Sequence, residues 1–173
     1  MRKIRLTNTS DDYFPDAWSL YNDAFPSDER RLLSHQIEIL SLNYYHFEVL
    51  LNENDFIGIV LWWEFEDLKF IEHLAIQPSQ RAKGYGKEIL STFITRDNRP
   101  VLLEVELPEN KINENRILFY QKLGFKLNYH SYSQPSMRIG SQPVELYLMS
   151  FPDPISKELV SNFILQYHPR IYR

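Results

Sequence analysis

The segment from Phe70 to Thr95 constrains the fold of this chain more than any other stretch. An apolar run of strand length ends at a proline, and a polar loop with two glycines, Gly84 and Gly86, leads into a run with apolar residues at positions i, i+1, i+4 and i+5. Glycines let a backbone approach a ligand closely, and the first free N–H groups of a helix point outward at its positive end. The segment therefore predicts a strand, an anion-binding loop and a helix.

The spacing of the loop residues excludes two common kinds of phosphate-binding loop. A dinucleotide-binding loop needs glycine where Ile89 stands, and a Walker loop needs glycine at position 81 and Ser or Thr at position 88, which are Arg81 and Glu88. The pattern that fits is Arg-x-x-Gly-x-Gly, at Arg81, Gly84 and Gly86, between a strand and an amphipathic helix. This arrangement resembles the acyl-CoA loop of the GNAT N-acetyltransferase superfamily.

A second stretch, Asn115 to Phe125, also resembles the GNAT pattern, with a tyrosine at position 120 and a Gly-Phe pair at its end. We expect a helix over about 113–123 that stops with Gly124 at C′ and Phe125 at C″. In that cap Tyr120 stands at C3, where its ring packs against Phe125. The two stretches lie in the order that the superfamily has.

Periodicity and turn signals predict the remaining elements in chain order. We expect strands at 2–7, 47–51, 56–63, 70–76 and 101–106, two more within 126–152, and helices over about 14–25, 33–42, 89–95, 113–123 and 155–167. A polar residue of 8–11 caps the first helix, and the apolar face of the second carries Leu33, Ile37 and Leu40. Strand, helix and strand over 70–106 imply a parallel pair in an otherwise antiparallel sheet.

The fold class that follows is α+β, with helices on both faces of a central mixed sheet. The GNAT resemblance implies that the two parallel central strands splay apart. We expect a single domain over 1–173. The helix at about 155–167 packs either on this domain or on a second copy, so monomer and homodimer both stay open.

Composition excludes several classes of protein. The absence of cysteine removes disulfides, thiol nucleophiles and thiolate metal sites, and no His or acidic pair has metal-ligand spacing. A formal charge of −4 with scattered Lys and Arg argues against nucleic-acid binding. No apolar run approaches a membrane span, and no apolar core follows the basic N-terminus, so we expect a cytoplasmic protein without a membrane partner.

The resemblance implies transfer of an acetyl group from acetyl-CoA to a primary amine by direct attack in a ternary complex. The main chain around Leu74 would pair with the pantetheine arm, the N–H groups from Arg81 to Lys87 would hold the pyrophosphate, and the Leu74 N–H would stabilise the oxyanion. The cofactor residues expected on this basis are Leu74, Ala75, Ile76, Arg81, Ala82, Lys83, Gly84, Tyr85, Gly86, Lys87, Asn115 and Tyr120.

Three side chains are candidates for moving protons. Tyr120 is the candidate acid for the departing thiolate. Glu72 and Glu104, on neighbouring strands, are the candidate bases, because a carboxylate in a buried strand needs a partner or a task. Strict alternation places Glu72 on the same side as Leu74, the proposed oxyanion donor, which favours Glu72 as the base. His73, interpreted as a structural histidine, is placed on the other side.

The acceptor site rests on aromatic and acidic residues together. Trp62 and Glu64 at the end of a strand, with Phe25 and Glu29 after the first helix, would hold a cation through ring faces and charge. A small cationic amine is the first expectation. A protein amine, either a lysine or an N-terminus, and a non-catalytic CoA-binding sensor are the alternatives.

Overall fold

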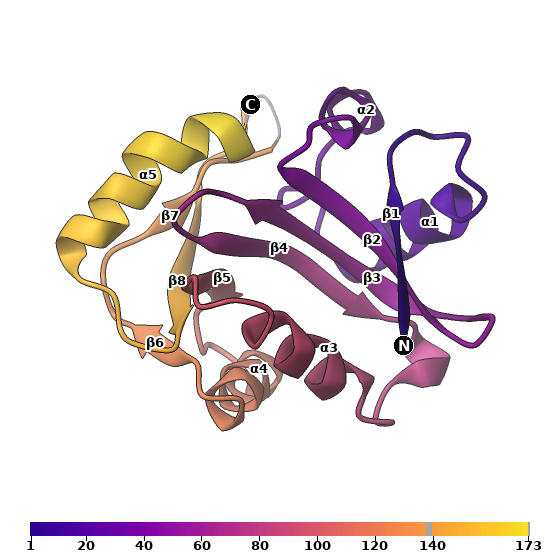
Figure 1. The fold of residues 1–173 in the computed structure, drawn as a ribbon. Helices are drawn as coiled ribbons and strands as arrows, with labels where there is room; N and C mark the ends of the chain where they lie inside the picture. Colours follow the sequence, from indigo (N-terminus) through magenta and orange to yellow (C-terminus); the bar gives the residue numbers. More distant parts are fainter. Residues whose placement is uncertain (138–139, 173) are drawn as a thin grey trace.

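The apolar runs of the sequence become the strands of one mixed sheet in the computed structural model, which describes residues 1–137 and 140–172. Its strands lie in the order β1-β2-β3-β4-β5-β8-β6, and the short β7 pairs with β8 (Figure 1). The elements are β1 (Arg2–Leu6), α1 (Phe14–Ala24), α2 (Leu33–Leu40), β2 (Tyr45–Asn52), β3 (Asp55–Glu64), β4 (Lys69–Ile76), α3 (Tyr85–Ile94), β5 (Val101–Glu106), α4 (Lys111–Lys122), β6 (Lys126–Asn128), β7 (Ser133–Gln134), β8 (Val144–Phe151) and α5 (Lys157–Ile171).

The centre of the sheet is the parallel pair β4 and β5. Strands β1 to β4 form an antiparallel ladder, and β5 continues antiparallel to β8. The parallel ladder holds only from the pair Lys69 and Val101 to the pair Ile71 and Leu103. Beyond Ile71 the two strands separate, which confirms the predicted mixed sheet with splayed central strands.

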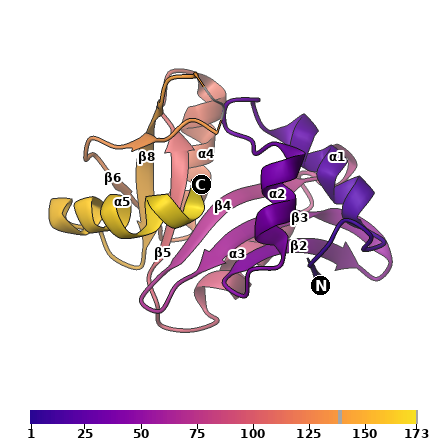
Figure 2. The same cartoon turned by 90° about the horizontal axis from the view of Figure 1, so that it is seen from above.

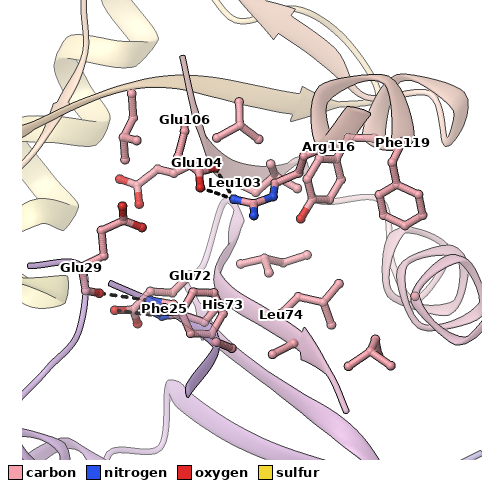
Figure 3. A pocket seen from close by; sticks show the side chains of 18 of the residues that line it. Phe25, Glu29, Glu72, His73, Leu74, Leu103, Glu104, Glu106, Arg116 and Phe119 are labelled. Carbon is pink, nitrogen blue, oxygen red and sulfur yellow. Dashed lines mark hydrogen bonds and ion pairs between the residues drawn. The ribbon is translucent and has the colours of Figure 1, made fainter. Parts of the chain in front are cut away.

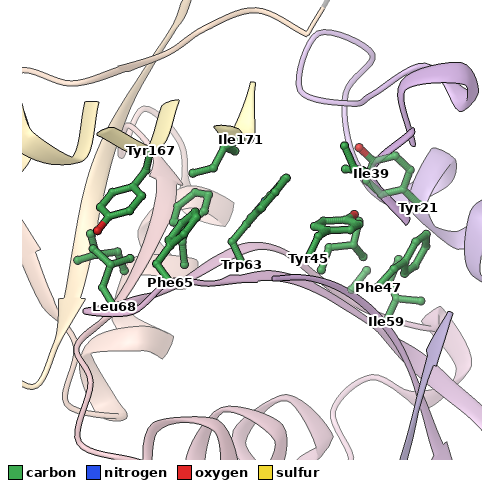
Figure 4. Packing of buried hydrophobic residues seen from close by; sticks show 14 of the residues in the cluster. Tyr21, Ile39, Tyr45, Phe47, Ile59, Trp63, Phe65, Leu68, Tyr167 and Ile171 are labelled. Atoms are coloured by element: carbon green, nitrogen blue, oxygen red, sulfur yellow. The ribbon is translucent and has the colours of Figure 1, made fainter. Parts of the chain in front are cut away.

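The helices cover both faces of the sheet, as predicted. Helices α1, α2 and α5 lie on one face over a cluster of buried residues that includes Tyr21, Phe47, Trp63 and Tyr167 (Figure 4). Helices α3 and α4 lie on the other face over a second cluster (Figure 1). Burial of apolar side chains on both faces holds the strands in register, because a slip of one residue would exchange the two faces.

The last helix packs on the sheet and runs further than expected, from Lys157 to Ile171. Its Phe163 ring lies 5.2 Å from that of Phe70, and Tyr167 stacks on Phe65 at 4.2 Å between ring centroids. The C-terminal end of α5 points toward α2 (Figure 2). Helix α5 therefore packs on the sheet of its own chain, and contact with a second copy stays a prediction.

Two helix expectations were wrong in detail. The Asp11 carboxylate accepts hydrogen bonds from the N–H groups of Thr7 and Asn8 and shapes the preceding turn, so α1 begins after Tyr13 without a side-chain cap. In α2 the buried face carries Gln36, whose side-chain NH2 donates to the Tyr45 hydroxyl at 2.9 Å. Ile39 and Leu40 are buried with Gln36, whereas the expected core residues Leu33 and Ile37 lie exposed.

The cap at the end of α4 forms as predicted. Gly124 has φ of +95°, its N–H donates to the Gln121 carbonyl, and the Phe125 N–H donates to the Tyr120 carbonyl. The Tyr120 and Phe125 rings meet edge to face, 5.7 Å apart. This Schellman arrangement fixes the position of Tyr120 beside the gap between β4 and β5.

Candidate active site

The gap between the splayed strands opens into a cleft of about 680 Å³. Its walls come from β4, β5, α4, the start of α3 and the segment between α1 and α2 (Figure 3). The cofactor residues expected from the sequence that line it are Leu74, Ala75, Ile76, Arg81, Gly86 and Tyr120, and the expected proton-moving and acceptor residues that line it are Glu72, Glu104, Phe25 and Glu29. One cavity therefore brings together expected site residues that lie far apart in the sequence, from Phe25 to Tyr120.

A β-bulge in β4 changes which way its side chains point. His73 pairs with Leu61 of β3 and Ile71 pairs with Trp62, so Glu72 is left as the extra residue. Glu72 and His73 both face the side of α1, whereas Leu74 faces the side of α3. The expectation that Glu72 shares a face with Leu74, opposite His73, was therefore wrong, because strict alternation does not hold across a bulge.

Glu72 is buried in an ion pair. Its Oε1 accepts from the Arg31 guanidinium and its Oε2 accepts from Trp63 Nε1 at 2.8 Å. Arg31 is buried as well, and it also donates to the carbonyl of Ile171 at the end of α5. Both carboxylate oxygens of Glu72 thus have partners that a buried charge requires.

His73 joins the bulge to the segment after α1. Its Nε2–H donates to the Glu29 carbonyl at 3.1 Å, and its ring meets Phe25 edge to face at 4.3 Å. Burial lowers the pKa of His73 to about 4, so the ring is neutral at physiological pH. The contact fixes the backbone of Glu29 at the mouth of the cleft.

Glu104 is a buried carboxylate of the cleft whose pKa is strongly changed by its surroundings. It lies on β5 just past the last pair with β4, and its Oε1 accepts hydrogen bonds from the hydroxyls of Tyr132 and Tyr172. Burial raises the pKa of Glu104 to about 7, against the lowering effect of the two hydroxyls. A carboxylate with such a pKa accepts a proton near neutral pH, as a general base must.

Acidic side chains surround the same end of the cleft. Glu29 and Glu106 line it with Glu104, and Arg116 pairs with Glu106 (Figure 3). Asp23 also lines the cleft. Burial, followed by the charge of Glu106, raises the pKa of Glu29 to about 7. Because several negative charges lie close together here, a bound cation would be stabilised at this end.

Tyr120 lines the cleft from α4 and is close enough to Arg116 and Glu106 to feel their charges. Burial raises the pKa of its hydroxyl to about 12. A thiol has a pKa of about 8.5, so a proton would not pass completely from this tyrosine to a free thiolate. The hydroxyl remains a hydrogen-bond donor throughout the neutral range.

The far end of the cleft meets the loop before α3. Ala82 and Gly84 have left-handed backbones, with φ of +61° and +87°, and Gly84 is the N-cap of α3 without a side-chain cap. The Glu88 N–H donates to the Gly84 carbonyl, so the N–H groups of residues 85–87 precede the first intrahelical bond. The start of α3 can therefore receive an anion, with Gly86 on the lining of the cleft.

Several expected residues do not line the cleft. Ala82, Lys83, Gly84, Tyr85 and Lys87 belong to the loop and the start of α3 but are not on its lining, and Asn115 is exposed on α4. For these residues, contact with a ligand stays a prediction.

The expected acceptor residues Trp62 and Glu64 lie elsewhere. Trp62 is fully buried in the cluster under α3, with Phe93 at 5.0 Å, and Glu64 accepts from Arg99 at 2.7 Å. The placement was wrong because β3 runs antiparallel to β4, so that Glu64 pairs with Lys69 at the end of β4 remote from the splay.

Several polar residues near the site were missed in the sequence. They include Asp23, Arg31, Arg116, Tyr132 and Tyr172. Arg31 carried a usable signal, because a buried glutamate in a central strand implies a cation elsewhere in the chain. The two tyrosines carried none, since nothing local links them to β5.

Other kinds of site find no support in the described part of the chain. Residues 1–137 and 140–172 contain no group of three His, Cys, Asp or Glu side chains that could hold a metal ion. Within the same residues, no helix has the length and apolar character needed to cross a membrane.

Comparisons with known proteins agree with this geometry. A family model described as an acetyltransferase (GNAT) domain matches residues 43–127, from β2 to β6. A solved structure described as an acetyltransferase from the GNAT family, from Bacteroides thetaiotaomicron, has a TM-score of 0.92 and 28% identity over 99% of this chain and 98% of that one. No curated protein matches the chain.

Two more distant structures share the fold alone. The ribosomal-protein-S18-alanine N-acetyltransferase from Escherichia coli has a TM-score of 0.59 and 16% identity over 91% of this chain and 97% of that one. An aminoglycoside 6'-N-acetyltransferase complexed with coenzyme A has a TM-score of 0.62 and 12% identity over 91% of this chain and 100% of that one. One is described by a protein acceptor and the other by a small molecule, so the fold does not identify the acceptor.

Proposed function

Because the chain belongs to the GNAT superfamily of acetyltransferases, we propose that it transfers an acetyl group from acetyl-CoA to a small cationic primary amine. The observation that carries the proposal is a single cleft whose two ends have different chemistry. One end reaches the uncapped start of α3, and the other holds Glu29 and Glu104. The phosphates of acetyl-CoA are anionic and the acceptor is a cation, so the transfer needs one end of the cleft for each charge.

The splayed strands support binding of acetyl-CoA as the donor substrate. Past Ile71 the edge of β4 that faces β5 has no strand partner, so the backbone of Leu74 and Ile76 is free to pair with an amide-containing arm. Gly86 and the N–H groups of residues 85–87 receive the pyrophosphate. The Leu74 N–H then stabilises the oxyanion that forms on the thioester carbonyl.

Glu104 is the base in this proposal. Once the acceptor ammonium has lost its first proton, the amine nitrogen attacks the thioester carbon, the new C–N bond forms, and the carboxylate takes the second proton from the nitrogen. The C–S bond then breaks, and Tyr120 donates a hydrogen bond to the departing sulfur. Glu72 is the less suitable base, since both of its oxygens already accept hydrogen bonds.

The acidic end of the cleft supports a cationic acceptor. Glu29 and Asp23 lie where a second positive charge of the acceptor would sit, and a cation there lowers the mutual repulsion of the acids. A protein amine and a sensor role are the rival functions. A sensor would need the phosphate-binding end but not a buried base.

The test is a panel of small mono- and diamines and of peptides, with acetyl-CoA as donor and release of free thiol as the signal. The kcat/KM of the parent should rise with pH through about 7, because Glu104 acts when deprotonated. Glu104→Gln should remove this limb and lower kcat by about 10²–10⁴. The control is Glu109→Gln, which changes an exposed glutamate that does not line the cleft and should keep both the pH limb and the kcat of the parent.

The outcomes separate the rival functions. Glu29→Gln should raise KM more than it lowers kcat, because it removes an acid that holds the acceptor. Thiol release with peptides alone would favour a protein acceptor. CoA binding without thiol release from any amine would contradict the enzyme and favour the sensor.

A further inference from the structure

Glu104 is held by two tyrosines that come from distant parts of the chain. Tyr132 lies in the segment between β6 and β7, and Tyr172 follows the last turn of α5. Both hydroxyls donate to the same carboxylate oxygen, Oε1, and the bond from Tyr172 is 2.6 Å long. Glu104 itself lines the cleft.

We propose that Tyr132 and Tyr172 are positioning residues for Glu104, which hold Oε1 so that Oε2 is turned to the acceptor amine. The residue after α5 is thereby a part of the active site. This inference rests on the proposed function, because it assigns Glu104 the role of base. It adds to that function two residues that do not touch the substrate.

The hydrogen-bond direction in this cluster is fixed by its chemistry. Tyr132 donates to Glu104, so its oxygen must accept from His168, whose Nε2 lies 2.9 Å away. Burial lowers the pKa of His168 to about 4, which leaves a neutral ring with one N–H to donate. Burial raises the pKa of both tyrosines well above the ordinary value of 10, so both stay donors.

In the chain from His168 through Tyr132 to Glu104, each hydrogen bond strengthens the next. His168 polarises the Tyr132 hydroxyl, and the Tyr132 hydroxyl in turn binds a charged oxygen, for which hydrogen bonds are stronger than between neutral groups. The buried carboxylate is thereby satisfied without a cation. A cation beside Glu104 would lower the pKa of its carboxylate and so make it a weaker base.

Tyr172 is placed by packing rather than by chance. Its ring meets His168 edge to face at 4.9 Å between centroids, and Arg31 donates to the Ile171 carbonyl next to it. Arg31 is itself paired with Glu72 of β4. The end of α5 is thus tied to the same group of residues that shapes the cleft.

Other charged groups also act on Glu104 and must be kept constant in a test. Glu72 from β4 and Glu29 from the segment after α1 both raise its pKa through their charge. The pair of Glu106 and Arg116 lies at the same end of the cleft. The hydrogen bonds from Tyr132 and Tyr172 lower the pKa of Glu104, so the removal of either hydroxyl should raise that pKa.

The experiment compares Tyr132→Phe and Tyr172→Phe with Tyr167→Phe. Tyr167 lies on α5 and donates to the Asp67 carboxylate, so the control removes the same kind of bond away from the cleft. The titration of Glu104 is followed by NMR in protein labelled with ¹³C at the glutamate carboxyl carbon, and the signal is assigned by its loss in Glu104→Gln. The pH profile of kcat/KM is measured in parallel.

Each of the two variants should move the Glu104 titration upward from about 7 by about one pKa unit, and the pH limb of kcat/KM should move with it. Tyr167→Phe should leave both in place. A merely structural role would lower activity without moving either midpoint, and unchanged midpoints would overturn the proposal. If the NMR midpoint moves but no amine releases thiol, the tyrosines still hold Glu104 and the proposed function is what fails.

Discussion

Replacement of Glu72 by glutamine decides whether this residue is a base or the counter-ion of Arg31. The two side chains are 1% and 2% exposed, and each oxygen of Glu72 accepts from a different donor. A glutamine can offer an oxygen to only one of these donors, Arg31 or Trp63. Its NH2 group would face the other, and the guanidinium would keep a buried charge without its partner.

The expected cost follows from that geometry. Removal of one partner from a buried ion pair destabilises by about 3–5 kcal/mol. Arg31 keeps its bond to the Ile171 carbonyl and its contacts with the rings of Tyr45 and Trp63, so the lower end of that range, about 3 kcal/mol, applies. In a protein of this length the melting temperature should fall by roughly 6–12 °C.

Urea unfolding followed by tryptophan fluorescence measures the free energy of unfolding. Glu114→Gln is the matched control, because its pair with Lys111 is exposed, at 46% and 76%, and should contribute less than about 0.5 kcal/mol. In a double-mutant cycle, Glu72→Gln with Arg31→Met should cost less than the two single changes added together, since the double variant leaves no charge unpaired.

The pH profile supplies the refuting result. Glu72→Gln should keep the limb of kcat/KM that Glu104 produces, moved to lower pH because the charge of Glu72 no longer raises the pKa of Glu104. Our assignment of Glu72 would be refuted by a variant whose stability is within 1 kcal/mol of the parent but whose pH limb is gone.

Two further predictions concern the walls of the cleft. Gly86→Asp places a negative charge in the first turn of α3, which suits the helix dipole but repels a pyrophosphate, so CoA should bind roughly tenfold or more weakly than to the uncharged Gly86→Asn control by calorimetry; equal affinities would mean that the phosphates lie elsewhere. Tyr120→Phe should keep the edge-to-face contact with Phe125 and the CoA affinity but lower kcat by about ten- to a hundredfold, through loss of one donor to a charged atom, and an unchanged kcat would leave the tyrosine with its packing role alone.

The order of the elements could be predicted because each depends on residues close together in the sequence. The cap at Gly124, the hairpin between β2 and β3 and the parallel pair β4 and β5 all follow from local patterns and from the handedness of the crossover. The splay between the parallel strands followed from a family resemblance. No local sequence pattern predicts this splay.

The side-chain arrangement within the cleft could not be predicted in the same way. The bulge at Glu72 depends on how β3 and β4 pair, and alternation read along β4 alone gives the wrong face. Trp62 and Glu64 were misplaced because the sequence does not say at which end of β4 the ladder opens. The partners of Glu104 come from positions 132 and 172, which only the folded chain brings to β5.

The bond between Arg31 and the carbonyl of Ile171 joins residues 140 positions apart. During synthesis a chain leaves the ribosome from its N-terminal end, and contacts across such a separation form last. The strands β1 to β5 and the loop before α3 have then already emerged, whereas Tyr172 reaches Glu104 only after α5 has followed them. The loop residues proposed to receive the phosphates therefore leave the ribosome before Tyr132 and Tyr172, which hold Glu104 at the end proposed for the amine.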